Sequence, residues 1–152
     1  MLYGILKWLH ILAAIAIVGA HASYGIWIVR ASNYREALPF TLRNVAWVDQ
    51  RVVFPAYALL LITGFAMMGI VRAWQTAPWL LTGLGLFVVL ILAHVFVYRP
   101  TLRRMIQLLD RDGFDSPGYQ AAAAREANLG IALVVLMVVI VFVMVVKPGL
   151  WA

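Results

Sequence analysis

The sequence of 152 residues contains no cysteine. This absence excludes disulfide bonds, thiolate metal ligands and thiol catalysis. Charged residues are also scarce, at 12%, whereas hydrophobic residues make up 65% of the chain. This balance lies well outside that of soluble domains. We therefore expect a single transmembrane domain that covers residues 1–152.

The hydrophobic residues form four runs bounded by charges, at residues 8–29, 52–71, 79–98 and 127–146. Each run is about 20 residues long, enough for a helix to cross a hydrocarbon core roughly 30 Å thick. The small residues of AHAS have the look of a signal-peptidase site, but the run continues through YGIWIV, so we expect an uncleaved helix. The predicted fold class is an all-α, integral membrane four-helix bundle.

The basic residues are distributed unevenly between the two ends of these runs. Nine flank the connections at about 30–51 and 99–126, whereas only Lys7, Arg72 and Lys147 lie at the other ends. The positive-inside rule then places both termini on the outer, periplasmic side of a bacterial inner membrane and the two connections in the cytoplasm. The net charge of +6 is explained by this topology and by contacts with lipid head groups. We see no nucleic-acid motif.

The two cytoplasmic connections differ in character. The first contains Pro39 among apolar and aromatic residues, and part of it is expected to lie along the membrane interface. The second begins with PTLRRMIQLLDR, breaks at DGFDSPG and then resumes, so the third and fourth helices should project past the membrane. Asp115 or Ser116 before Pro117 suits a helix cap.

Histidines are the polar residues that stand out within the runs. His10 and His21 lie within about 20° of the same helix face, about 16 Å apart along the axis. His21 and His94 both fall in the inner half of the membrane, about one helical turn apart in depth. Two imidazoles that face each other in a bundle form a natural axial pair for haem b. We predict that His21 and His94 hold a haem iron, with Arg51 or Arg99 near its propionates.

His10 lies near the outer surface, at the level of Met67, Met68 and Met144. A second haem there would use His10 with methionine, water or no ligand on its other face, and a copper site would use His10 with these methionines. The histidines could instead be interhelical hydrogen-bonding residues, and the methionines core filler. No carboxylate lies within the four runs, which argues against a zinc or iron–carboxylate site and against a carboxylate proton relay.

Three stretches carry a resemblance to known families: LKWLHIL, VDQRVVFPAYALLLITGFAMM and REANLGIALVVLMVVIVFVMVVKP. They resemble the HemJ-type membrane protoporphyrinogen IX oxidases and the copper-resistance D-like membrane domains. The matching positions are Lys7, His10, Arg51, His94, Arg125, Asn128, Lys147 and Pro148. The sequence departs from that pattern at AIVGAHASYG and at Leu129, where an acidic residue is expected. Its overall pattern is also similar to a family of predicted bacterial four-helix integral membrane proteins.

The resemblance and the histidines together lead to one expectation and two alternatives. We expect a haem b protein that transfers electrons or oxidises a porphyrinogen- or quinol-like substrate, which would make it a membrane oxidoreductase. The alternatives are a cofactor-free membrane subunit and a small copper-handling module. Small-residue faces would permit a homo-oligomer or a larger membrane complex.

Overall fold

A computed structural model describes residues 1–71 and 77–149, and within these ranges every regular element is a helix. Four helical stretches are long and apolar enough to cross a membrane: Leu2–Ser32, Leu38–Val71, Pro78–Asp112 and Pro117–Val146. The predicted all-α membrane fold with four spans is therefore confirmed. Its orientation across the membrane stays a prediction, and Arg72 lies outside the described residues.

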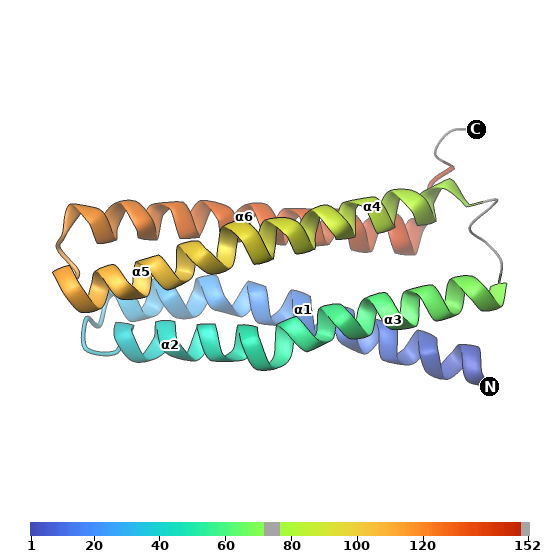
Figure 1. Cartoon of the computed structure of the whole chain (residues 1–152), viewed down its shortest axis with the longest axis horizontal. Coiled ribbons are helices and arrows are strands. Elements are labelled where there is room, and N and C mark those ends of the chain that lie inside the picture. Colours follow the sequence, from blue (N-terminus) through green and yellow to red (C-terminus); the bar gives the residue numbers. More distant parts are fainter. Residues whose placement is uncertain (72–76, 150–152) are drawn as a thin grey trace.

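We call each of these four helical stretches a rod. Two of the rods are built from several elements joined end to end. The elements in order are α1 (Leu2–Ser32), α2 (Leu38–Val48), η1 (Asp49–Val53), α3 (Phe54–Val71), α4 (Pro78–Ala93), η3 (His94–Tyr98), α5 (Arg99–Asp112) and α6 (Pro117–Val146). The π-helical segments η1 and η3 continue α2 into α3 and α4 into α5 without a break in the chain's direction (Figure 1).

The first connection is thus a helix that continues the rod of α3 instead of lying along the membrane interface. The reason is a stripe of fully buried residues, Leu38, Leu42 and Val45, at helical spacing. This stripe packs α2 against α1 and α5. The third predicted helix was expected to extend past the membrane, and the structure has helix α5 in that segment.

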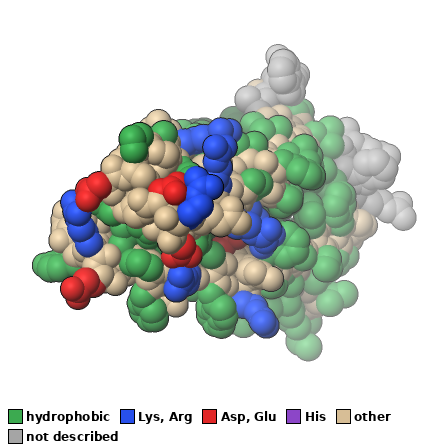
Figure 2. Space-filling view, turned by 60° about the vertical axis from the view of Figure 1, so that its left-hand side comes forward, with side chains coloured by type: hydrophobic (Ala, Val, Ile, Leu, Met, Phe, Trp, Pro, Cys, Tyr) green, Lys and Arg blue, Asp and Glu red, His purple; other side chains and the backbone are tan. Residues whose placement is uncertain are grey.

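The four rods form two antiparallel hairpins (Figure 1). Helix α1 packs along α2 and α3, and α6 packs along α4 and α5. The hairpins meet through contacts of α1 with α6 and of α2 with α5. The start of α1 and the end of α6 lie at one end of the bundle, and the α1–α2 and α5–α6 turns lie at the other, which we call the charged end (Figure 1). Figure 2 shows acidic and basic side chains gathered there, with apolar surface beyond them.

The rods are longer than a membrane is thick. The 35 residues of Pro78–Asp112 extend for about 52 Å, against about 30 Å for a hydrocarbon core. Large apolar side chains are exposed along the middle of the rods, among them Ile15, Ile62, Val89 and Phe142. Such a surface suits contact with lipid, and a rod of this length extends about 20 Å beyond a hydrocarbon core of that thickness.

The charged end is held by local caps and ion pairs. Ser116 is the N-cap of α6, and its hydroxyl oxygen accepts a hydrogen bond of 3.2 Å from the Tyr119 backbone N–H. Gly113 ends α5 with a φ of 80°, a conformation that glycine adopts without strain. Arg35 pairs with Asp115 at 2.7 Å, which ties the α1–α2 turn to the α5–α6 turn.

Candidate functional site

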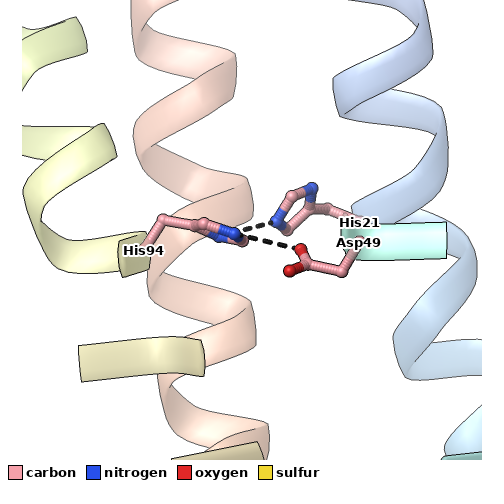
Figure 3. Close-up of side chains that lie close together, drawn as sticks. All are labelled: His21, Asp49 and His94. Carbon is pink, nitrogen blue, oxygen red and sulfur yellow. Dashed lines mark hydrogen bonds and ion pairs between the residues drawn. The ribbon is translucent and has the colours of Figure 1, made fainter. Parts of the chain in front are cut away.

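Three ionisable side chains from three of the rods meet inside the bundle (Figure 3). His21 comes from α1, Asp49 opens η1 and His94 opens η3. Their exposed fractions are 4%, 2% and 0%. His94 stands between the other two, with its Nδ1 3.3 Å from His21 Nε2 and its Nε2 3.0 Å from Asp49 Oδ1. We call these three residues the His–Asp cluster.

The hydrogen bonds around His21 fix which ring atoms carry protons. The His21 Nδ1–H donates to the Ile17 carbonyl at 3.0 Å, so Nε2 of the neutral ring is an acceptor. His94 must then donate from Nδ1 to His21, which leaves His94 Nε2 as an acceptor when that ring is also neutral. This acceptor lies beside the Asp49 carboxylate, and the contact is favourable only when a proton or another cation is present.

Further charged and aromatic groups surround the His–Asp cluster. The Nε of Arg99 lies 3.1 Å from Asp49 Oδ2. The Tyr98 ring stacks on His94 with centroids 5.4 Å apart, and its hydroxyl donates to the buried Glu126 carboxylate at 2.9 Å. Arg99 thus offsets the charge of Asp49, and Tyr98 supplies a hydrogen-bond partner for Glu126.

Unpaired polar atoms are concentrated at this site. In the described part of the chain, the buried side-chain atoms without a hydrogen-bond partner are Tyr24 OH, Asp49 Oδ1, Tyr57 OH and His94 Nε2. Although Asp49 Oδ1 and His94 Nε2 are close, they are not aligned for a hydrogen bond. The Tyr24 ring centroid lies 5.3 Å from that of His21, and the Tyr57 ring centroid 5.2 Å from that of His94. Because buried polar groups are nearly always paired, their gathering indicates that a polar partner binds among them.

The backbone is unusual at the same place. Both π-helical segments begin at a member of the His–Asp cluster, η1 at Asp49 and η3 at His94. A π-helical turn accommodates one extra residue within an α-helix, and such turns occur frequently at functional sites. Here they place two cluster residues on neighbouring rods at one level.

The cluster offers ligand atoms for a single metal ion. One nitrogen from each histidine and one oxygen of Asp49 lie within 4.8 Å of one another. Of the two His94 nitrogens, Nε2 lies 3.0 Å from Asp49 Oδ1 and has no hydrogen-bond partner, so it is the one that could bind a metal together with Asp49. His21 also shows the usual arrangement of a metal ligand, since its second nitrogen donates to a backbone carbonyl.

The structure brings His21 and His94 together, but not as an axial haem pair. In such a pair the iron and its macrocycle lie between the two ligating nitrogens. Here His21 Nε2 and His94 Nδ1 are in direct contact. The residues as arranged therefore do not fit a haem between them. Of the two arginines predicted near the propionates, Arg99 pairs with Asp49, whereas Arg51 is exposed.

His10 lies apart from the His–Asp cluster. Its Nδ1 donates to the hydroxyl of Thr63 on α3 at 2.9 Å, while that hydroxyl donates to the Leu59 carbonyl. The bond to Thr63 gives His10 the interhelical role that was one alternative from the sequence. The methionines are placed separately: Met67 and Met68 are half-buried on α3, and Met144 of α6 lies against Gly83 of α4.

Sequence reasoning missed the two buried carboxylates, because it considered only the four apolar runs, which contain none. Asp49 and Glu126 border the predicted runs, yet they are only 2% and 5% exposed because the helices continue past the runs. The helical spacing of the neighbouring apolar residues did indicate that these two carboxylates are buried. Asp49 falls in the buried stripe Val45, Asp49, Val53 and Tyr57, and Glu126 falls four residues after Ala122.

Comparison with known proteins identifies one family. The family model described as "Predicted integral membrane protein (DUF2269)" matches residues 4–148. No curated protein and no solved structure matches the chain. The match covers nearly the whole sequence and all four helical stretches, while the resemblance to the HemJ-type and copper-resistance D-like proteins stays a hypothesis. The chain belongs to the DUF2269 family of predicted integral membrane proteins.

Proposed function

We propose that this protein is a multi-pass metalloprotein of the bacterial inner membrane that binds one divalent transition-metal ion at the His–Asp cluster. The observation that carries the proposal is the set of buried, unpaired polar atoms around His21, Asp49 and His94. A metal ion would take up Asp49 Oδ1 and a nitrogen of His94, and water on the metal would supply partners for the tyrosine hydroxyls.

The donor set favours iron among the common metals. Two imidazoles and one carboxylate are the ligands of non-haem Fe(II) sites, in which further coordination positions stay open. Iron would make the protein a redox protein, as expected from the sequence. The resemblance adds a porphyrinogen- or quinol-like substrate to this proposal. When bound, the iron would supply one-electron chemistry, while the chain would supply ligands, burial and the neighbouring Arg99 charge.

Metal analysis of the purified protein tests the proposal. The full chain would be purified in mild detergent without chelators, supplied with Fe(II) under anaerobic conditions, and analysed for metals by mass spectrometry. We expect about one iron per chain, lost in His21→Gln and in Asp49→Asn. His10→Gln is the matched control, because it makes the same change outside the cluster and should keep the metal.

Several outcomes would contradict the proposal. One is a folded His21→Gln protein that retains its metal, and another is a wild-type protein that takes up no metal after reconstitution. A pyridine haemochrome assay separates the haem hypothesis. About one haem b per chain, lost in His21→Gln, would replace the mononuclear metal site with a haem site and would require the two rings to separate.

A further inference from the structure

A cleft of about 40 Å³ opens on the surface of the bundle beside the His–Asp cluster. Asp49 is the one member of the cluster that reaches it. The cleft lies between the α2–η1 rod and α5, and its lining residues are Ala46, Asp49, Gln50, Arg99, Leu102 and Arg103. Gln50 and Arg103 are exposed, so a ligand can enter from the surrounding medium.

The charges of the lining favour an anion. Asp49 is already paired through Oδ2 with Arg99 Nε, so its charge is offset from within the protein. Arg103 adds a second guanidinium, which leaves the lining with one excess positive charge. The terminal amino groups of Arg99 and Arg103 and the Gln50 amide supply N–H donors for oxygen atoms.

The position of the cleft indicates the source of that anion. Arg99 lies over the ring of Phe54, whose exposed side chain opens the apolar surface of α3, with 5.1 Å from the guanidinium carbon to the ring centroid. On the opposite side, the exposed Arg43–Asp110 pair belongs to the charged end. The cleft thus lies where apolar surface gives way to charged surface, which is the level of lipid head groups.

We propose that this cleft binds the phosphodiester group of an anionic membrane phospholipid, with Arg99, Arg103 and Gln50 as its donors. The lipid's phosphate would lie beside Arg99, and its acyl chains would follow the apolar surface next to Phe54. The site can be tested separately from metal binding, because its proposed donors, Arg99, Arg103 and Gln50, are not among the proposed metal ligands.

Lipid titration of the full, delipidated chain in non-ionic detergent tests this site. Native mass spectrometry would count bound short-chain phosphatidylglycerol, and parallel titrations would use diacylglycerol of the same chain length and inorganic phosphate. We expect binding of phosphatidylglycerol that Arg103→Gln weakens by roughly tenfold, because a charge-assisted hydrogen bond to the phosphate is lost. Arg104→Gln, a neighbouring exposed arginine outside the cleft, should change the affinity less than twofold.

Four results would overturn the proposal. Equal losses in the Arg103 and Arg104 variants would mean a general effect of surface charge, and no loss in Arg103→Gln would remove the cleft as the binding site. Diacylglycerol that binds as tightly as phosphatidylglycerol would show that the acyl chains alone are recognised. Inorganic phosphate that competes at equal concentration would show a site for free phosphate rather than for lipid.

Discussion

Replacement of Asp49 by asparagine removes a buried charge and leaves its shape nearly unchanged. Asp49 is 2% exposed, and the side chain of its partner Arg99 is 17% exposed. Removing one partner of a buried ion pair costs about 3–5 kcal/mol. Because Arg99 keeps some solvent contact and its contact with Phe54, and because the asparagine oxygen still accepts hydrogen bonds, we expect a smaller loss of about 2–3 kcal/mol.

Thermal unfolding in detergent, followed by tryptophan fluorescence, measures this loss. At about 2–4 °C per kcal/mol for a chain of this size, Asp49→Asn should lower Tm by about 4–12 °C. Asp110→Asn is the matched control, because its pair with Arg43 is exposed and should contribute less than about 1 kcal/mol. Arg99→Gln should cost less in the Asp49→Asn background than in the wild type. Equal Tm losses in the two asparagine variants, or strictly additive effects with Arg99→Gln, would refute the reasoning.

Two further pairs of variants probe packing and hydrogen bonding elsewhere in the bundle. Glu126→Gln keeps an acceptor for the Tyr98 hydroxyl and should be nearly neutral, whereas Glu126→Leu leaves that hydroxyl buried without a partner and should cost about 1–3 kcal/mol in thermal unfolding. Gly83→Leu should also cost about 1–3 kcal/mol, since a Cβ there overlaps the methyl group of Met144, while Gly85→Leu on the same helix meets no atom and should leave Tm unchanged.

The fold was predictable because membrane spans are defined by composition and length. Four runs of about 20 apolar residues sufficed to predict four helices. The helices that continue these spans were harder to predict, α2 more so than α5. Helix α2 contains Pro39, which reads as a loop residue, yet Pro39 lies in the first turn of the helix, where proline is tolerated. The buried stripe that begins at Leu38 decides the structure of this segment.

The site was predictable only in part. The depth of His21 and His94 could be estimated from helix rise, and the two residues indeed meet. Their direct contact could not be predicted, because it depends on how closely the rods approach and on the π-helical turns, for which the sequence carries no simple signal. Asp49 and Glu126 were missed since charged residues that border an apolar run read as the ends of a span. Burial of these carboxylates depends on partners from other rods, Arg99 and Tyr98.

The π-helical segment η1 has a consequence for the register of its rod. One residue turns an α-helix by about 100° and advances it by about 1.5 Å. If Asp49–Val53 wound as a regular α-helix with the same number of residues, the faces of α2 and α3 would rotate by about that angle relative to each other. The stripe that buries Leu42 and the face that carries Tyr57 could then no longer point into the bundle together. The extra residue at the site therefore acts as a phase shift that aligns the two halves of the rod.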